Sequence, residues 1–311
     1  LKPRFEYEAM KNAFQQRGER SLDGMSWVEA LCMGTSELKE EGWSQPPAMT
    51  LVTMHMPRNL LDSFDTAPEV PFPCGFKTAW YSIDGKVRPL VTDTLIIAER
   101  VRRKLMGIHK YVMEGDPSKV SLNFSGKNPD SSPVTGHGHC FYLPLDMDRD
   151  GRLDTLIITS NTPFNEDETE ALNRLDSVWQ EKGRGDLSLV LTRLSKENSG
   201  IKGRVWESAT PFVTSRHYRK GRGDFSEWLS RELTKELEFQ DFPTPEGIEN
   251  LRACTRSSHS FHWVEFVRSR KNNVPLQGYG FRISFPGEIQ GPIAIGALCH
   301  FGLGVFLPEK R

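Results

Sequence analysis

The order of strand-like and helix-like segments between residues 76 and 194 constrains this fold more than any other feature of the sequence. Strands are expected at 76–83, 139–145, 153–160 and 187–194, where β-branched and aromatic residues gather. A helix is expected from Thr92, with apolar residues at helical spacing to Ile108, and a second from Pro163 to Trp179. The resulting β-α-β-β-α-β order predicts a ferredoxin-like unit.

The second half of the chain begins to repeat this order. Strands are expected at 205–214, 261–267 and 279–285, and Asp224 is placed to cap a helix that runs to about Phe239. The second helix of the unit is expected to be missing or replaced by the glycine-rich stretch 291–304. We therefore predict an α+β fold of two tandem ferredoxin-like units.

Three divisions of the chain follow from these patterns. Residues 1–48 are expected to form a connector of helix and loop that cannot bury a core alone. Residues 49–195 are expected to form the first ferredoxin-like unit, which opens with a strand at Met49–Met56, and residues 196–311 the second. Because the chain begins at Leu1, we expect it to be the downstream part of a longer protein.

Composition and charge exclude several classes of protein. No apolar run approaches the roughly 18 residues of a membrane helix, which excludes a helical membrane protein. The five cysteines are widely spaced and form no CxxC pair, which favours reduced thiols in a cytoplasmic protein over a disulfide framework or a zinc site. Residues 191–311 hold 18 Lys and Arg against 13 Asp and Glu, a balance compatible with an anionic partner.

Two histidines lie where the strand expected at 139–145 begins. His137 and His139 would face the same side if that strand extends to them, since the strand period is two. Imidazoles titrate near neutrality, so the pair could supply the base and the acid of a phosphodiester cleavage. A structural role, with one histidine ending the strand and the other packed on Phe141, is the alternative, and metal binding by the pair is a third interpretation.

An acidic stretch follows the same strand. It matches the start of a DxDxDG calcium loop, but residue 157 is Ile where the loop's bidentate Glu is expected. We favour a tight hairpin turn over a calcium site formed by Asp146, Asp148, Asp150 and Asp154.

Basic and glycine-rich segments occupy the C-terminal part. The loop at 215–223 combines cations with an aromatic residue and glycines, which suits phosphate contacts and base stacking, although a solvated surface loop is an equal alternative. The stretch 291–306 carries no Walker lysine and no GxGxxG, so it does not indicate a nucleotide cofactor.

Several short motifs, taken together and in order, resemble one known family. They are EGWSQPP at 41–47, PLVTDT at 89–94 with AERVRR at 98–103, FSGK at 124–127, GHGHCFYLP at 136–144, TPFV at 210–213, GP at 291–292 and HFGLG at 300–304. The set resembles the type I-U (I-G) CRISPR-associated fusion protein of the RAMP superfamily, in which a domain that binds the crRNA 5′-handle precedes a repeat-processing endoribonuclease domain. The resemblance covers residue 40 to the end and therefore mainly the endoribonuclease half.

The resemblance implies tandem ferredoxin-like units, a glycine-rich loop that lies against RNA, and cytoplasmic location in a prokaryote. It implies cleavage of precursor crRNA repeats without a metal or other cofactor. In that reaction the ribose 2′-OH attacks the adjacent phosphate and leaves a 2′,3′-cyclic phosphate and a 5′-hydroxyl. Other subunits of a type I-U (I-G) interference complex, of the Cascade type, are the implied protein partners.

Candidate site residues follow from the motifs and the resemblance together. We expect His137 or His139 as base and the other as acid, Lys127 or Arg216 on the developing charge, and Tyr142 as a positioning residue. His217 and His300 are rival candidates for the catalytic histidine. The residues expected to contact RNA are Arg216, His217, Tyr218, Arg219, Lys220, Arg222, Arg268, Arg270, His300, Phe301, Gly302 and Gly304.

Two other functions remain open from the sequence. A non-catalytic crRNA-binding subunit would hold RNA without cutting it. A metal-dependent phosphodiesterase would combine His137 and His139 with the acidic turn.

Overall fold

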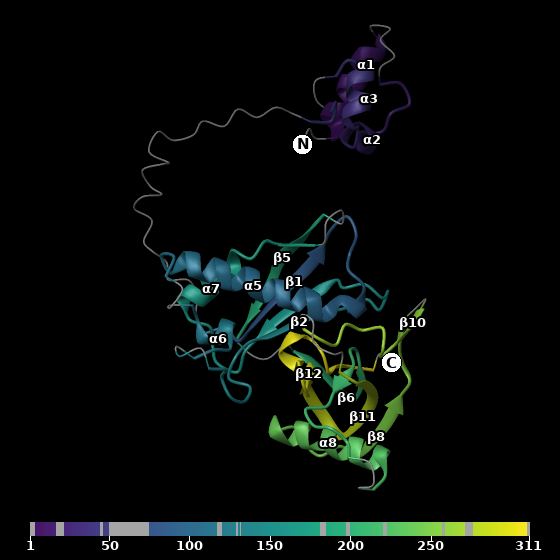
Figure 1. The fold of residues 1–311 in the computed structure, drawn as a ribbon. Helices are drawn as coiled ribbons and strands as arrows, with labels where there is room; N and C mark the ends of the chain where they lie inside the picture. The colour runs from purple at the N-terminus through teal and green to yellow at the C-terminus, as the bar shows by residue number, and fades with distance from the viewer. Residues whose placement is uncertain are drawn as a thin grey trace. The chain divides into compact units, whose positions relative to one another are not determined.

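The structure is a computed structural model that describes residues 4–16, 22–43, 46–49, 75–116, 120–128, 130, 132–180, 185–196, 200–219, 223–256, 259–270 and 276–309. The chain divides into two compact units, residues 1–70 and residues 71–311 (Figure 1). No described helix is long and apolar enough to cross a membrane.

Three helices lie among the described residues of the N-terminal unit. They are α1 (Arg4–Gln16), α2 (Trp27–Leu31) and α3 (Thr35–Glu40). A reciprocal capping box between Ser26 and Glu29 starts α2, and Tyr7, Ala30 and Ala48 form a small buried cluster. Of the strand expected at Met49–Met56, Met49 is not in a strand, and residues 50–56 lie outside the described residues.

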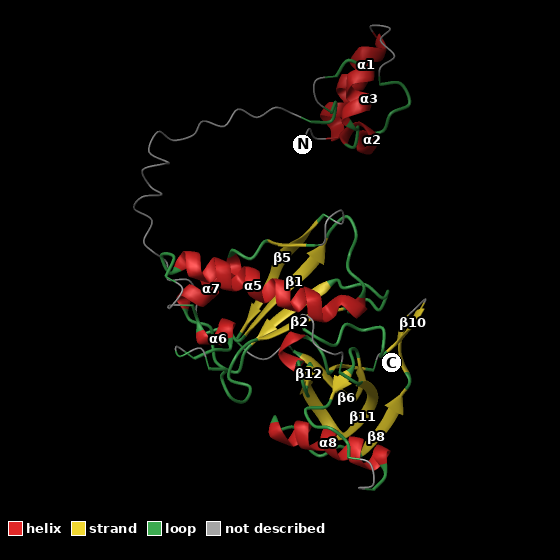
Figure 2. Ribbon diagram, viewed as in Figure 1, coloured by secondary structure: helices red, strands yellow, loops and turns green. Residues whose placement is uncertain are grey.

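The first ferredoxin-like unit has the predicted element order. Its elements are β1 (Thr78–Asp84), α5 (Thr94–Val112), β2 (Phe141–Leu145), β3 (Thr155–Thr159), α7 (Glu166–Asn173), β4 (Ser177–Trp179) and β5 (Asp186–Ser195). The sheet order is β2-β3-β1-β5-β4 with antiparallel neighbours, and α5 and α7 lie together on one side of it (Figure 2). Two short helices, η1 (Val91–Asp93) and α6 (Leu122–Ser125), complete this unit.

The second expected helix of this unit is shorter than predicted. It ends at Asn173 instead of Trp179, and residues 177–179 form the edge strand β4 against β5. Val178 is buried and Trp179 is 59% exposed, which is the alternation of a strand and not of a helix.

The second ferredoxin-like unit contains β6 (Ile201–Ser208), β7 (Phe212–Val213), α8 (Phe225–Phe239), β8 (Gly247–Leu251), β11 (Gly278–Gly291), β12 (Ile293–Ala294) and β13 (Val305–Pro308). Its sheet runs β12-β13-β6-β11-β7, and β8 also pairs with β11. The four strands β13-β6-β11-β8 thus have the ferredoxin-like order, and the 3₁₀ turn η3 (Cys299–Phe301) stands where the second helix would be. The predicted fold class is confirmed.

The strand expected at 261–267 is wrong. The hairpin of β9 (Ala253–Arg256) and β10 (His259–His262) ends there, and residues 263–265 form a turn. The missed strand is β8, whose sequence GIENL lacks the apolar alternation of a half-buried strand because most of its residues lie at or near the surface.

The two ferredoxin-like units pack against each other through the sheet face opposite α5 and α7. Phe141, Leu143 and Ile157 from the first unit form one buried cluster with Val305 and Leu307 from the second. Residues 71–311 therefore form one body, and the ends of β2 and η3 meet at this junction.

Hydrogen bonds from its own backbone amides and ion pairs with Arg88 stabilise the acidic turn between β2 and β3. The Asp154 carboxylate accepts hydrogen bonds from the amides of Met147 (2.9 Å) and Asp148 (3.0 Å), and Arg88 pairs with Asp148 and Asp150. Asp146, Asp148 and Asp154 each bring an oxygen within 4.8 Å of the others. These bonds agree with the hairpin that we favour.

Replacing Asp154 by alanine is expected to lower the free energy of unfolding by about 1–3 kcal/mol, because the part-buried amide of Met147 and the exposed amide of Asp148 lose their acceptor. Urea denaturation measures the change. Asp186→Ala, at an exposed position at the start of β5, is the control and is expected to stay within about 0.5 kcal/mol of the unaltered chain. Equal effects of the two substitutions would contradict the assigned role of Asp154.

Candidate active site

Three histidines meet where the two ferredoxin-like units join. His137 and His139 lie in the segment that leads into β2, and His300 lies in η3 of the second unit. The chain around η3 fits closely on the first unit: a Cβ added to Gly302 would lie 2.6 Å from Thr94 Cγ2 and 3.3 Å from the Tyr142 carbonyl oxygen. This close approach places His300 beside β2.

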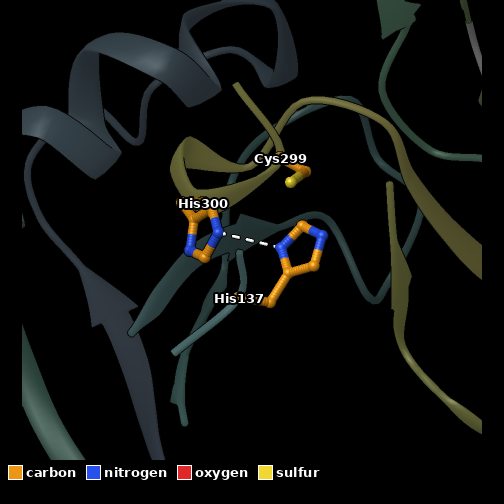
Figure 3. Close-up of side chains that lie close together, drawn as sticks. All are labelled: His137, Cys299 and His300. Atoms are coloured by element: carbon orange, nitrogen blue, oxygen red, sulfur yellow. Dashed lines mark hydrogen bonds between the residues drawn. The ribbon is translucent and has the colours of Figure 1, made fainter. Parts of the chain in front are cut away.

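The three imidazoles form a stack with Phe141. The rings of His139 and His300 are 3.7 Å apart between centroids with 10° between planes, and those of Phe141 and His300 are 4.0 Å apart. His137 Nδ1 lies 3.0 Å from His300 Nε2 (Figure 3). Of the two histidines expected to be catalytic, His137 therefore forms a hydrogen bond with His300, the other candidate for the catalytic histidine.

The hydrogen bonds fix the tautomers of two of these rings. His300 Nδ1 lies 3.1 Å from the Cys140 carbonyl oxygen, which can only accept, so this nitrogen carries the proton and Nε2 holds a lone pair. His137 Nδ1–H must then donate to His300 Nε2, which leaves the lone pair of His137 on Nε2. Gln240 Nε2 lies 3.3 Å from that nitrogen and also donates to the Ala294 carbonyl oxygen at 2.8 Å.

Burial keeps all three rings neutral at pH 7. Desolvation is the main cause that lowers the pKa of His300 to about 3 and that of His139 to about 4, and the charge of Arg102 contributes to the shift of His139. Desolvation also lowers the pKa of His137, while the nearby Glu236 carboxylate opposes this shift. His137 is thus a neutral imidazole whose Nε2 lone pair faces the Gln240 amide, and such a nitrogen can accept a proton.

Acid is therefore expected to destabilise the fold. Below pH 6.5 the imidazoles of His139 and His300 bind protons more readily in the unfolded chain than in the folded one, so the free energy of unfolding should fall as the pH is lowered from 7 to 4. Thermal unfolding across this range measures it. His139→Phe, which keeps a stacking ring without a titrating nitrogen, should flatten the pH dependence, and His217→Asn at an exposed position should not. A slope unchanged in His139→Phe would contradict this assignment.

His137 also lines a cavity between the two ferredoxin-like units. The cavity has a volume of about 530 Å³, which is within the range of small-ligand sites, and its wall includes Phe141, Asn161, Gln240 and Pro292. Phe239, at the end of α8, is 65% exposed and its ring lies 5.3 Å from that of His137. His137 alone among the three histidines lines this cavity.

The other expected catalytic residues do not reach the cavity wall. Tyr142 is 1% exposed, its hydroxyl donates to the Phe124 carbonyl oxygen at 3.0 Å, and burial raises its pKa. Lys127 is exposed. It follows Gly126, where an added Cβ would collide with the His139 ring. The structure thus does not bring Tyr142 to the histidines, because its side chain belongs to the core of the first unit.

The acidic turn lies at the far end of β2 from the histidines. His139 precedes the strand and Asp146 follows it, so the five residues of the strand, with a rise of about 17 Å, lie between them. The histidines and the acidic turn therefore cannot share one metal ion, which removes the geometric basis of the metal-dependent phosphodiesterase.

The expected RNA-contacting loop is partly engaged within the protein. Arg216 pairs with Glu232 at 3.3 Å, and the Tyr218 hydroxyl donates to the Gly223 carbonyl oxygen at 2.7 Å. His217 and Arg219 are exposed, as RNA contact requires. Lys220 and Arg222 lie outside the described residues.

The remaining expected RNA contacts face protein in this structure. Gly302 and Gly304 are buried, and the guanidinium of Arg268 donates to three backbone carbonyl groups. Arg270 pairs with Glu99 and lies 4.3 Å from the Phe301 ring centroid. These residues build the junction that carries His300.

Three site residues were not singled out from the sequence. Phe239 and Gln240 lie at the C-terminal end of α8. Arg102 on α5 is half-buried, donates a hydrogen bond to the Ser125 carbonyl oxygen and acts electrostatically on His139. Of these three, only Arg102 could have been found from the sequence, because it lies within the AERVRR motif. The other two are ordinary residues whose position depends on the packing of the second unit.

Comparison with known proteins gives similar solved structures but no sequence match. No protein-family model and no curated protein matches the chain. The similar structures include "An RAMP protein binding different RNA substrates", with 14% identity over 75% of this chain and 100% of that one (TM-score 0.36). Another, from Pyrococcus furiosus, is described as a Cas6-related gene, with 13% identity over 74% of this chain and 97% of that one (TM-score 0.36). A third is Cas6b, with 11% identity over 75% of this chain and 100% of that one (TM-score 0.37).

Proposed function

We propose that this chain is an endoribonuclease that binds precursor crRNA and cuts its repeats without a metal ion. One observation carries the proposal: a neutral histidine, His137, turns its unprotonated Nε2 toward Gln240 at the wall of a 530 Å³ cavity between two ferredoxin-like units. The motifs that resemble the RAMP fusion protein, among them GHGHCFYLP and HFGLG, supply the two segments that build this site.

In the proposed reaction His137 Nε2 accepts the proton of the ribose 2′-OH as the 2′-oxygen attacks the adjacent phosphorus. The bond from phosphorus to the 5′-oxygen breaks, and that oxygen leaves with a proton as a 5′-hydroxyl. His300 acts as a positioning residue, since its bond to the Cys140 carbonyl oxygen directs the tautomer of His137. Arg102 acts electrostatically on His139 and is a candidate to stabilise the phosphorane charge.

Two residues are candidates for the proton donor. His139 is neutral without RNA because its pKa is about 4, so it can serve as the acid only after a bound phosphate raises that pKa. Lys127 follows the glycine that packs on His139 and is the second candidate for this step.

Cleavage of repeat RNA in EDTA tests the proposal. The unmodified repeat is expected to be cut to a 2′,3′-cyclic phosphate and a 5′-hydroxyl, while a repeat with a 2′-deoxyribose at the scissile position is expected to bind and remain intact. Cleavage of the deoxy repeat, or cleavage only after addition of a divalent metal, would contradict the mechanism.

A non-catalytic crRNA-binding subunit is the second candidate. The observation that favours it is the ring stack of His139 and His300, in which both side chains are half-buried and can act as packing residues. Binding of the repeat without cleavage of either RNA would select it. In both cases we propose that the chain stays with its RNA as a subunit of a type I-U (I-G) effector complex.

A further inference from the structure

A sulfur and two nitrogens converge beside the cavity. Cys299 Sγ, one ring nitrogen of His300 and one of His137 all lie within 4.8 Å of one another, as Figure 3 shows. Two of these residues are adjacent in η3, and the third comes from the first ferredoxin-like unit. The packing of the two units thus creates a donor set that neither unit has alone.

The two ring nitrogens already lie at a separation that suits one metal ion, with the proton of His137 Nδ1 now between them. His300 donates its Nδ1 proton to the Cys140 carbonyl oxygen and points its Nε2 lone pair at His137. A backbone carbonyl on the second ring nitrogen is the usual support of a metal-bound histidine. The His137 and His300 nitrogens are 3.0 Å apart, close to the ~3.3 Å between two nitrogens that bind one tetrahedral zinc ion at 2.0–2.1 Å.

We propose that Cys299 Sγ, His300 Nε2 and His137 Nδ1 form a site for a zinc-like divalent metal ion that regulates the chain. One thiolate and two imidazoles select borderline-soft ions such as zinc and cobalt, whereas magnesium, calcium and manganese prefer oxygen. Cys299 is 2% exposed, so the thiolate–metal bond is shielded from water. The fourth position is left for a water molecule, because the described chain supplies three donors here.

Binding has a defined proton balance. The Cys299 thiol loses its proton to solvent and becomes a thiolate. His137 loses the proton on Nδ1, which then binds the metal, and gains a proton on Nε2, so the ring stays neutral. One proton leaves the protein for each metal ion bound.

The same proton shift makes the metal an inhibitor. This part rests on the proposed function, in which His137 Nε2 accepts the proton of the 2′-OH. With a metal on Nδ1, Nε2 is protonated and no longer a base. Zinc is therefore expected to stop a reaction that needs no metal.

Titration of the reduced, metal-free full chain with Co²⁺, without RNA, tests the site directly. We expect one bound Co²⁺ per chain, with a thiolate-to-cobalt charge-transfer band in the near ultraviolet and the visible bands of tetrahedral coordination. Added Zn²⁺ should displace the cobalt and abolish both. Absence of the charge-transfer band in the unaltered chain would overturn the proposal without any variant.

Matched cysteine variants locate the thiolate. Cys299→Ser should lose the band and weaken Zn²⁺ binding by about 100-fold, whereas Cys254→Ser, at an equally buried thiol outside the donor set, should keep both. Circular dichroism confirms that each variant is folded. A band that persists in folded Cys299→Ser, or disappears in folded Cys254→Ser, would place the metal elsewhere.

A cleavage assay separates this proposal from the proposed function. Zn²⁺ should inhibit repeat cleavage by the unaltered chain, and Cys299→Ser, compared with its own zinc-free rate, should need at least tenfold more Zn²⁺. A cobalt band without RNA cleavage would support the site and contradict the nuclease. Cleavage that is insensitive to Zn²⁺, in a chain without a cobalt band, would contradict only the site.

Discussion

His137→Ala is expected to lower the rate of repeat cleavage by about 10²–10⁴-fold while leaving the affinity for the repeat within about threefold of its original value. His137 lines the cavity and holds its lone pair on Nε2, so its loss removes the proton acceptor without removing a charge from the surface. Single-turnover cleavage at saturating protein measures the rate, and a filter-binding titration with the 2′-deoxy repeat measures the affinity.

Two matched variants sharpen this result. His217→Ala removes an exposed histidine of the basic loop and should reduce affinity more than the single-turnover rate. His300→Ala should slow cleavage less than His137→Ala, because it removes the acceptor that orients His137 and not the base itself. A single-turnover rate that survives in His137→Ala would exclude this residue as the base and favour His139 or the non-catalytic subunit.

Gly304→Ala is expected to lower the free energy of unfolding by about 4 kcal/mol, the largest stability effect that we predict. Gly304 has φ of +62°, and a Cβ added there would lie 1.9 Å from the Ile295 carbonyl oxygen, a backbone atom that cannot turn away. The Gly304 amide also donates to the Pro211 carbonyl oxygen at 2.8 Å, so its segment has little room to move. Urea denaturation of the purified variant measures the change, and a low yield of folded protein is the same result in a stronger form.

Gly107→Ala is the matched control and should have the opposite sign. Gly107 is an exposed residue within α5, and nothing lies within 4 Å of an added Cβ. Alanine stabilises a helix interior relative to glycine, so a gain of about 0.5–1 kcal/mol is expected. If Gly304→Ala were as well tolerated as Gly107→Ala, the packing assigned to the HFGLG motif would be wrong.

The ring stack was foreseen only in part. The HxH spacing drew attention to His137 and His139, and His300 was a rival candidate, but no sequence pattern shows that residues 163 positions apart share a hydrogen bond. Tyr142 illustrates the opposite case. It is part of the GHGHCFYLP motif, yet the strand directs its side chain into the core, where its hydroxyl donates a hydrogen bond to the Phe124 carbonyl oxygen.

Local patterns account for the elements that the sequence determined by itself. The apolar spacing of α5 and the β-branched runs of β1, β3 and β5 depend on neighbours within a few residues, and these recur in the structure. The pattern also predicted that a glycine-rich stretch replaces the last helix, because three glycines between 296 and 304 cannot support one. The exposed strand β8 carries too few apolar residues to be found this way.

Only the tertiary structure decided which side chains form the site. The face of the first sheet that packs on Val305 and Leu307 also brings η3 against the start of β2, and this contact places Cys299 and His300 beside His137. Gly302 permits that approach because any side chain would meet Thr94. The reason is physical: periodicity reports which face of an element is buried, whereas the identity of the neighbour depends on the shape of surfaces far apart in the chain.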